Sequence, residues 1–361
     1  MRNPELDVLL YGATGFTGRL CAQALQQLGV RFAVSGRDAR KLEALSATVG
    51  NVPVVPAALD HAAALTEAAS RARVVLDCAG PFARYGRPVL DAAFAAGAHF
   101  LDITGESPWM RETYFRHGDA VQRGIALVNA VGFDVVPTDC AASLAAGAPS
   151  LAGSCERVRI AFASRGGRPS QGTMRSALNL ADQGGLAYLD GRWVKEPVGT
   201  EIWQAPFPEL GSRPCPSIPW GDLVTAPRST GARYVRTFMK LPKLAPLVSR
   251  IGGPLLKLPF TKALAERAIG RLPEGPSAEE RRSARFYVVA EAIAPGGRIT
   301  ERVWVTGGEG YELTAASAAL CAKLAAAPEF TLTGALTPSQ AFGADKLLDQ
   351  LAPHGVKWGR N

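Results

Sequence analysis

Short apolar runs alternate with helical patterns along the first 140 residues. The runs are rich in Val, Leu, Ile and Ala and predict six strands, at residues 7–11, 31–35, 52–56, 74–78, 99–104 and 125–131. Between the first two, apolar residues recur on one helical face from Leu20 to Leu28, and Gly29 ends the helix. Strands and helices that alternate at this spacing predict a parallel sheet covered on both faces. We therefore expect an α/β domain with a doubly wound Rossmann sheet over residues 1–140.

A different pattern begins near Pro137 and predicts a second domain. Three segments alternate apolar and polar residues as half-exposed strands do, at residues 157–164, 284–294 and 299–306. The last two are joined by Pro-Gly-Gly-Arg at 295–298, which is a hairpin signal. We expect an α+β domain over residues 141–333, which binds substrate or forms a dimer. It is built on a mainly antiparallel sheet with helices on one face.

Prolines and helical periodicity mark the remaining segments. Residues 197–227 are rich in proline and are expected to consist mostly of loops. Helical patterns near residues 311–326 and 338–351 close the chain, and no internal repeat is present.

Composition narrows the class of protein. The chain has 361 residues, of which 47% are hydrophobic and 20% charged, so about two globular domains are expected. No run approaches the ~18 apolar residues of a membrane-spanning helix, and the first residues leave no room for a secretion signal. We therefore expect a cytoplasmic protein. Six scattered cysteines form no CxxC pair and four histidines lack metal-ligand spacing, which predicts reduced thiols and no metal site.

A glycine-rich turn follows the first strand directly. Residues 12–18 read Gly-Ala-Thr-Gly-Phe-Thr-Gly and open the first helix of a strand–turn–helix–strand unit. Gly12 lets the chain turn sharply, Gly15 leaves room for a pyrophosphate, and Gly18 lets the helix pack closely on the strand. The N–H groups at the start of the helix then bind the phosphates. A glycine turn without a ligand is the alternative. The residues predicted to bind a dinucleotide are Gly12, Thr14, Gly15, Phe16, Thr17 and Gly18.

The end of the second strand distinguishes the two nicotinamide cofactors. Enzymes that bind NAD usually place an acid there, and this chain has Ser35 in that position, followed by Arg37. A guanidinium can pair with a 2′-phosphate through two hydrogen bonds and stack on the adenine. Asp38 is better explained as the N-cap of the next helix. Ser35 and Arg37 therefore favour NADP, and a solvated loop arginine is the alternative for Arg37.

Four ordered motifs of the first domain resemble those of the saccharopine dehydrogenase-like oxidoreductases. They are GATGFTG at 12–18, SGRDARKL at 35–42, DCAGPFARYG at 77–86 and GAHFLDITGE at 97–106. The run Gly132-Phe133-Asp134, with Pro137 and Asp139, also fits the family. Weaker similarity at 172–176, 275–277 and 337–338 extends the resemblance over most of the chain.

The resemblance carries expectations of its own. In length and in its later segments the sequence looks like the branch of trans-acting enoyl reductases, which reduce carrier-bound acyl chains for lipid-making synthases. The family also implies that the C-terminal helical segment, residues 334–361, returns to the dinucleotide-binding domain.

The loop after the fourth strand is the expected place of the chemistry. It lies at the carboxyl edge of the sheet, where a doubly wound fold binds its ligand. We expect Cys78, Gly80 and Pro81 to contact the cofactor, with Gly80-Pro81 under the nicotinamide ribose. Tyr85 could donate a proton to the reduced substrate, because a phenol near a cofactor can act as a general acid. The alternative is that Tyr85 packs against and caps the next helix.

Four further residues allow two interpretations each. Glu106 could hold the nicotinamide carboxamide or the substrate, but the start of a helix is the favoured explanation. Asp134 could be an acid, or part of a hinge between domains. Thr173 and Arg175 are the best candidates for substrate contacts, and Arg175 could instead form surface ion pairs.

A basic segment accounts for the net charge of +8. Residues 228–271 contain ten lysines and arginines and one acidic residue, a net charge of +9. Within it, residues 241–269 are apolar, interleaved with Lys and Arg, and could lie on an anionic membrane. Short core helices with solvated basic faces, and contact with an acidic carrier protein, are the alternatives. Nucleic-acid binding is not expected, because the segment contains no recognised motif.

The sequence thus predicts an NADP(H)-dependent oxidoreductase. It is expected to reduce a C=C or C=N bond of an acyl-thioester or imine-type substrate by hydride transfer. The substrate is a small molecule or an acyl chain on a carrier protein, and a homodimer is compatible with the sequence. The alternative is a non-catalytic nucleotide-binding protein that associates with lipid surfaces through residues 241–269.

Overall fold

Two compact units make up the chain. The computed structural model describes residues 4–147, 155–181, 185–241 and 259–361. The first unit comprises Met1–Val136 and Tyr311–Phe342, and the second comprises Pro137–Gly310 and Gly343–Asn361. The chain therefore passes from one unit to the other three times.

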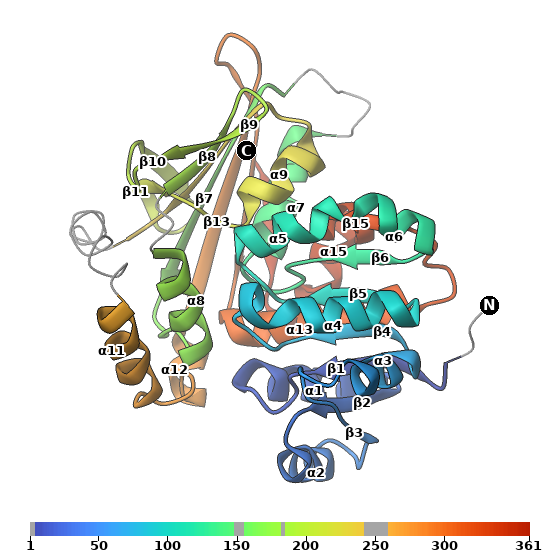
Figure 1. Cartoon of the computed structure of the whole chain (residues 1–361). Coiled ribbons are helices and arrows are strands. Elements are labelled where there is room, and N and C mark those ends of the chain that lie inside the picture. The colour runs from blue at the N-terminus through green and yellow to red at the C-terminus, as the bar shows by residue number, and fades with distance from the viewer. Residues whose placement is uncertain (1–3, 148–154, 182–184, 242–258) are drawn as a thin grey trace. The chain divides into compact units, whose positions relative to one another are not determined.

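The first unit is a parallel seven-stranded sheet flanked by helices (Figure 1). The strand order is β15-β6-β5-β4-β1-β2-β3, which is the doubly wound arrangement. All six strands predicted from the sequence are present, so the expected fold of this unit is confirmed. The strands are β1 (Leu6–Tyr11), β2 (Phe32–Gly36), β3 (Val54–Pro56), β4 (Ala72–Asp77), β5 (His99–Asp102), β6 (Ala126–Val128) and β15 (Gly334–Leu336). The helices are α1 (Phe16–Gln27), α2 (Ala39–Thr48), α3 (Ala62–Ser70), α4 (Phe82–Ala96), α5 (Ser107–Phe115), α6 (His117–Arg123), α13 (Gly310–Ala326) and α14 (Pro338–Phe342).

Burial explains why these segments form a covered sheet. Val8, Leu10 and Leu76 are fully buried within β1 and β4, as expected for strands with helices on both faces. Helix α1 turns Cys21, Ala22 and Leu25 inward. Of the face predicted from the apolar spacing, Leu25 is buried, whereas Leu20, Ala24 and Leu28 are only half-buried. Strand β1 lies between β2 and β4, so the strand order reverses beside it. The loops after β1 and β4 therefore meet at one edge of the sheet.

The seventh strand and one helix reach the first unit from late in the sequence. Strand β15 pairs with β6 in parallel, and the sequence pattern did not predict it. Helix α13 confirms the helical pattern at 311–326. Thr314 Oγ1 accepts the N–H of Phe133 at 3.0 Å, and the Ser317 hydroxyl donates to the Val131 carbonyl at 2.7 Å. These bonds attach α13 to the segment that follows β6.

The second unit is built on a nine-stranded mixed sheet. Its order is β10-β11-β12-β7-β13-β14-β16, with β8 pairing β12 and β9. All of its pairs are antiparallel except β12 with β7, so the predicted mainly antiparallel sheet is confirmed. The strands are β7 (Arg157–Arg165), β8 (Gly185–Leu189), β9 (Arg192–Glu196), β10 (Ile202–Phe207), β11 (Gly211–Ile218), β12 (Tyr234–Met239), β13 (Arg285–Ile293), β14 (Ile299–Gly307) and β16 (Lys357–Arg360). The helices are α7 (Val136–Ala146), α8 (Gln171–Ala181), α9 (Asp222–Thr230), α11 (Pro259–Gly270), α12 (Ala278–Ser283), α15 (Ala344–Gln350) and the 3₁₀ turn η2 (Ala352–His354).

Two predictions about local structure were wrong. Residues 197–227 are not mostly loop, because they form the hairpin β10–β11 and helix α9. Pro214 and Pro216 are tolerated in β11 because that strand pairs only with β10 there and meets β12 only at Ser217 and Ile218. The single helix expected at 338–351 is two short helices, which are separated by Gly343 at φ +78°.

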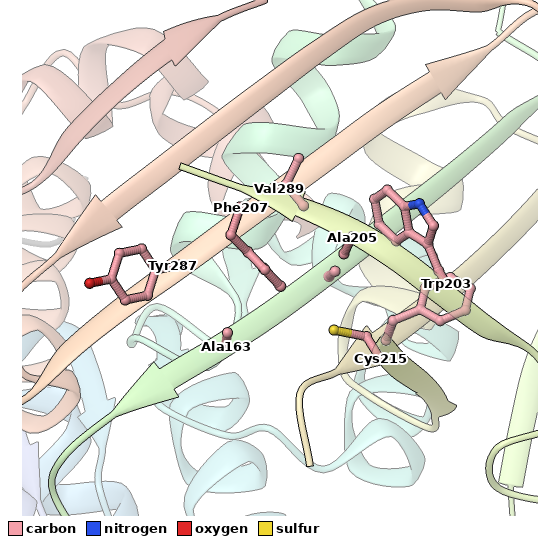
Figure 2. Close-up of a cluster of buried hydrophobic side chains, with 9 residues drawn as sticks. Ala163, Trp203, Ala205, Phe207, Cys215, Tyr287 and Val289 are labelled. Atoms are coloured by element: carbon pink, nitrogen blue, oxygen red, sulfur yellow. The ribbon is translucent and has the colours of Figure 1, made fainter. Parts of the chain in front are cut away.

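A cluster of buried side chains seats the β10–β11 hairpin on the sheet (Figure 2). Trp203, Ala205 and Phe207 of β10 and Cys215 of β11 are buried in it. Ala161, Ala163, Phe238, Tyr287 and Val289 of β7, β12 and β13 complete the cluster. The small alanines of β7 leave room for the large rings above them.

Among the helices of the described ranges, none has the length and apolar character needed to cross a membrane.

Candidate active site

The glycine turn after β1 is shaped by contacts that leave no room for side chains at two of its glycines. Gly12 has φ +72°, and a Cβ there would lie 2.7 Å from the Ala79 backbone nitrogen. A Cβ on Gly18 would lie 2.9 Å from the Cα of Ala13. The positive φ of Gly12 fits the predicted sharp turn, and Gly18 allows α1 to approach β1, as the sequence pattern predicted. Gly12 also allows the loop after β4 to approach, which the sequence did not predict.

Gly15 differs from the other two glycines. Its φ of −68° and ψ of 164° suit any residue, and a Cβ there would meet only the Gly12 carbonyl oxygen, at 3.4 Å. Gly15 is exposed and is the N-cap of α1, whose first turn no side chain caps. Protein packing thus does not require glycine here. The space beside the start of α1 suits a phosphate group, which helix N–H groups and the helix dipole would bind.

At the end of β2, one side chain faces inward and another faces solvent. The buried Ser35 hydroxyl donates to the Val55 carbonyl of β3 at 2.7 Å, so its hydrogen bond is directed to the sheet. Arg37 is exposed, and within the described ranges it has neither a hydrogen bond nor an ion pair. Asp38 accepts the N–H of Lys41 at 3.2 Å, which confirms it as the N-cap of α2. No carboxylate is therefore presented for a ribose 2′-hydroxyl at this strand end, and a free guanidinium is available for a phosphate.

The charge of Arg37 reaches the neighbouring strand. Tyr11, the last residue of β1, donates its hydroxyl to the Ala57 carbonyl at 3.1 Å. Burial and the nearby Asp77 carboxyl raise the pKa of Tyr11 to about 12, and the positive charge of Arg37 opposes this rise. Arg37 thus acts on the same edge of the sheet as the glycine turn.

Asp77 holds the loop after β4 in place. Its Oδ1 accepts the Ala79 N–H at 2.8 Å, and its Oδ2 has no hydrogen-bond partner in the described ranges. Burial raises the pKa of Asp77 well above its usual value, and the hydrogen bond from the Ala79 N–H opposes this rise. The adjacent Cys78 is a free thiol, 3.8 Å from the Cys21 sulfur, and the Gly80–Pro81 peptide bond is cis. The sequence analysis did not single out Asp77.

Glu106 caps a helix, but not its own. Its two carboxylate oxygens accept the N–H groups of Phe82 and Ala83, at 2.9 and 3.0 Å, in the first turn of α4. Glu106 is buried, and it also stands at the N-cap position of α5. The prediction that it only begins a helix therefore missed its main contact. Because this carboxylate occupies the start of α4, that helix end does not offer its N–H groups to a cofactor.

Tyr85 lies in the first turn of α4, one residue before the buried Gly86. The side chain is half-buried, and the Arg84 guanidinium lies 5.1 Å from the centre of its ring. Its hydroxyl bonds to no other described residue. Capping of α4 falls to Glu106, so the alternative role of Tyr85 as a cap is wrong. The free phenol leaves its role as a proton donor open to test.

Asp102 is the centre of a buried network at the end of β5. Its Oδ1 accepts the N–H groups of Thr104 and Ala130, at 3.1 and 2.9 Å. Its Oδ2 accepts Trp109 Nε1 at 2.7 Å and Asn129 Nδ2 at 2.6 Å. Burial raises the pKa of Asp102 to about 6, and these four donors limit that rise. Asp102 thus joins β5, α5 and the segment after β6, and it acts as a structural anchor.

Asp134 lies at the same edge of the first unit. A Cβ on Gly105 would lie 2.8 Å from its Oδ2, so Asp134 packs against the segment that follows β5. Its side chain is half-buried, and burial raises its pKa to about 6. An acid with this pKa changes its charge near neutral pH, which suits a proton donor. Asp134 also lies two residues before Val136, where the first segment of this unit ends, so both the acid and the hinge remain predictions.

The two predicted substrate residues lie on α8 of the second unit. Thr173 is exposed, and its hydroxyl lies 3.1 Å from the Ser170 hydroxyl. Arg175 donates to Gln171 Oε1 at 3.0 Å, one helical turn away, and forms no ion pair with any residue of the described ranges. Most of the basic apolar segment 241–269 lies outside the described residues, and only its ends, with α11, are described.

Comparison with known proteins places this chain in a family. Residues 8–128 match the model of the saccharopine dehydrogenase NADP-binding domain. A protein of Mycobacterium tuberculosis, named as a candidate trans-acting enoyl reductase, is 30% identical over 405 residues, covering 98% of this chain and 96% of the relative. The chain belongs to the saccharopine dehydrogenase-like oxidoreductases. The resemblance stated from the four motifs is confirmed, and residues 8–128 are the NADP-binding domain of this oxidoreductase.

Two further comparisons agree with this family. A trans-acting enoyl reductase of Mycobacterium ulcerans is 39% identical over 142 residues, which are 37% of this chain and 34% of that protein. The apo structure of saccharopine dehydrogenase (L-Glu forming) from Saccharomyces cerevisiae matches with a TM-score of 0.65. That match covers 98% of this chain and 99% of the other at 13% identity, so it shows a shared fold.

Proposed function

We propose that this saccharopine dehydrogenase-like protein is an NADPH-dependent enoyl reductase. It transfers a hydride to the C=C bond of an acyl thioester held by a carrier protein in the cytoplasm. The observation that carries the proposal is the similarity, over nearly the whole of both chains, to a relative named as a trans-acting enoyl reductase. Reduction of a C=N bond is the second candidate, supported by the fold shared with saccharopine dehydrogenase. The first unit, Met1–Val136 with Tyr311–Phe342, is the proposed cofactor domain, and the second unit is the proposed substrate domain.

The cofactor residues fit NADPH in their chemistry. We assign the pyrophosphate to the glycine turn, through Gly12, Thr14, Gly15, Phe16, Thr17 and Gly18. The 2′-phosphate is assigned to Arg37, with Ser35 shaping the strand end beside it. Cys78, Gly80 and Pro81 form the surface under the nicotinamide ribose, and Asp77 holds that loop through its bond to Ala79. NADPH supplies the hydride, so the chain itself must orient the reactants and exclude water.

A proton must follow the hydride to the reduced substrate. Tyr85 is the assigned donor, because its hydroxyl is not engaged by any described residue and α4 fixes its backbone. Thr173 and Arg175 are assigned to the substrate. Within the described ranges Arg175 makes one hydrogen bond, to Gln171, and so has further N–H groups for a carbonyl or phosphate oxygen.

Turnover with two substrates tests the reaction class. The purified protein is mixed with NADPH and either crotonyl-pantetheine or the imine formed from an α-keto acid and an amine, and nicotinamide absorbance is followed. Oxidation of NADPH with the thioester alone supports enoyl reduction, and oxidation with the imine alone moves the assignment to the C=N bond. Binding of NADPH without turnover of either substrate contradicts both assignments.

The Tyr85→Phe variant tests the donor. The expected result is a fall in kcat of about 100-fold with unchanged NADPH affinity, because general acid catalysis contributes on that order. Asp134→Asn is the matched comparison, since Asp134 is the other candidate acid at this edge. A Tyr85→Phe variant with the kcat of the unchanged protein excludes Tyr85 as the donor.

A further inference from the structure

A cavity of about 250 Å³ opens on one face of the mixed sheet, wholly within the second unit. It lies at the beginnings of β7 and β12 and extends to residues of β8 and β13. Its surface is mostly apolar. The residues that line it are Arg157, Val158, Arg159, Leu189, Glu201, Tyr234, Val235, Arg236, Phe238 and Ile293.

Two of the three arginines in the lining are neutralised by carboxylates. Arg159 pairs at 2.6 Å with Glu291, a fully buried side chain that also pairs with Arg302 at 2.6 Å. Arg236 pairs with Glu196 at 2.8 Å and with Glu201. These ion pairs hold the side chains in place and engage their charged groups, so they fix the shape and the charge of the cavity wall.

Arg159 is held from a second side. Its guanidinium lies over the Trp203 ring, 4.4 Å from the centre, and Trp203 belongs to the buried cluster under the β10–β11 hairpin (Figure 2). The cavity wall therefore continues directly into the packed core of this unit.

Arg157 is the third arginine and differs from the other two. It is exposed, and no carboxylate of the described ranges pairs with it. Its guanidinium lies 5.4 Å from the centre of the Tyr234 ring, a residue opposite it in the register of β7 and β12. The Tyr234 hydroxyl is likewise bonded to no described residue. A free guanidinium and a free phenol at one cavity provide the donors that an oxyanion requires.

Size limits the rest of the ligand. An apolar cavity of ~150 Å³ holds a benzene ring, so this cavity has room for one ring or a short alkyl chain beside a head group. Leu189, Ile293 and Phe238 supply apolar wall for such a body. Sites for drug-sized molecules begin at ~300 Å³, so this volume suits a smaller ligand.

The cavity is distinct from the residues assigned to the reduced substrate. Arg157 begins β7 and Arg165 ends it, about 25 Å apart at the usual rise of a strand. Helix α8, with Thr173 and Arg175, follows the end of the strand, whereas the cavity lies at its beginning.

We propose that this cavity is a second binding site, which takes a small amphipathic anion. Its carboxylate or phosphate group binds Arg157 and the Tyr234 hydroxyl, and its ring or short chain fills the apolar wall. This site goes beyond the proposed reductase activity and does not depend on it.

Ligand-observed NMR with three probes of similar size tests the site: benzoate, phenyl phosphate and neutral benzyl alcohol. Both anions are expected to bind in the millimolar range or tighter, and benzyl alcohol about tenfold more weakly. The tighter of the two anions identifies the head group that the site prefers. Absence of saturable binding by both anions, or equal binding of benzyl alcohol, overturns the proposal.

Variants locate the binding. Arg157→Gln is expected to weaken the anions about tenfold and to leave benzyl alcohol within twofold, because only the charged hydrogen bonds are lost. Arg165→Gln, an exposed arginine at the other end of the same strand, is the matched control and is expected to change nothing. Leu189→Trp fills the apolar wall and should weaken all three probes. Anion affinities in the Arg157→Gln variant that match those of the unchanged protein overturn the proposal.

Saturating NADPH separates this site from the cofactor site. The probes are expected to bind equally well in its presence, because the cavity contains no residue of the first unit. Competition between NADPH and phenyl phosphate would place the anion at the cofactor site and exclude the cavity. Failure of the thioester assay leaves these NMR results unaffected, so the two proposals fail separately.

Discussion

At the scale of single residues, the three glycines of the turn after β1 serve two different purposes. Gly12 and Gly18 are required by the packing of the protein itself, because a Cβ at either would collide with backbone atoms. A Cβ on Gly15 meets little protein, so the reason for glycine there must lie in the ligand. Substitutions at Gly15 and Gly18 should therefore separate the effect on cofactor binding from the effect on stability.

The variants Gly15→Ala and Gly18→Ala test this separation. Gly18→Ala is expected to lower the free energy of unfolding by about 1–3 kcal/mol, because α1 must move away from β1. Gly15→Ala is expected to cost less than about 1 kcal/mol, as an N-cap change, and to weaken NADPH binding at least tenfold. Urea unfolding and NADPH fluorescence titration measure the two effects. Equal NADPH affinity in Gly15→Ala and the unchanged protein would contradict this role of Gly15.

Arg37 is predicted to select NADPH over NADH. Arg37→Gln removes the free guanidinium and is expected to weaken NADPH by at least tenfold, about 1.4 kcal/mol, with NADH affinity unchanged. Nicotinamide fluorescence at fixed salt gives both affinities. Arg40→Gln, an exposed neighbour on α2, is the control. A similar loss for both cofactors, or the same loss in the control, would show that Arg37 contributes only general charge.

At the scale of elements, the start of α4 is held by a residue from the segment after β5. Glu106 satisfies two N–H groups of α4 and thereby fixes the helix that carries Tyr85. Its negative charge also lies at the positive end of the helix dipole. The contact links two neighbouring loops at the edge of the sheet where the cofactor is expected.

Loss of this carboxylate is predicted to loosen α4. Glu106→Ala leaves the Phe82 and Ala83 N–H groups without an acceptor and is expected to lower the free energy of unfolding by about 2 kcal/mol. Glu112→Ala, which removes an exposed ion pair with Arg87, is the control and is expected to cost less than about 1 kcal/mol. Chemical denaturation measures both. If Glu106→Ala costs no more than the control, the cap does not stabilise α4.

The elements that sequence could predict are those with long local patterns. The six strands, the glycine turn and the Asp38 cap each depend on neighbouring residues, and all were predicted correctly. Strand β15 has three residues and no pattern, so only its pairing with β6 defines it. Prolines concealed β10 and β11, because the sequence does not reveal that one side of β11 lacks a partner where Pro214 and Pro216 lie.

The candidate site was predictable in its cofactor half only. The glycine turn and Arg37 follow from spacing and charge, whereas the partner of Glu106 lies 24 residues away in the chain. Asp77 and Asp102 are brought into register by the pairing of β4 with β5, which no local pattern reports. Such contacts arise from the tertiary fold, and the signal that could have pointed to them is an acid at the end of each strand.

At the scale of the whole molecule, buried carboxyls make stability depend on pH. Burial raises the pKa values of Asp102 and Asp134 to about 6 from 3.8. Each carboxyl therefore binds its proton more tightly in the folded than in the unfolded chain. The stabilisation from this proton is complete below pH 3.8 and is lost as the pH rises through about 6. Asp7 and Glu280 have lowered pKa values in the folded chain. Their charged forms therefore stabilise the fold, and this stabilisation is lost as the pH falls below their usual pKa values.

The free energy of unfolding is predicted to increase when the pH falls from 7 to 5. Each of the two raised carboxyls is expected to contribute about 1 kcal/mol of this increase. Asp134→Asn removes one titrating group and should make the increase smaller by about 1 kcal/mol. Urea unfolding at the two pH values, followed by circular dichroism, checks this. A free energy that stays level or falls between pH 7 and 5 would show that these carboxyls are not protonated more readily in the folded protein.

The three passages of the chain between its units also set an order of events during synthesis. Most of the first unit has been translated once residue 136 is made, but its last strand, β15, and helix α13 come only with residues 311–342. At a translation rate of roughly 5–20 residues per second, this delay lasts about 10 to 40 seconds. Throughout that time the edge of β6 has no neighbour, and an unpaired edge strand invites association with other chains. During this part of synthesis the nascent chain therefore exposes a nucleotide-binding fold whose sheet lacks its last strand. A chaperone that acts on nascent chains would bind at the unpaired edge of β6.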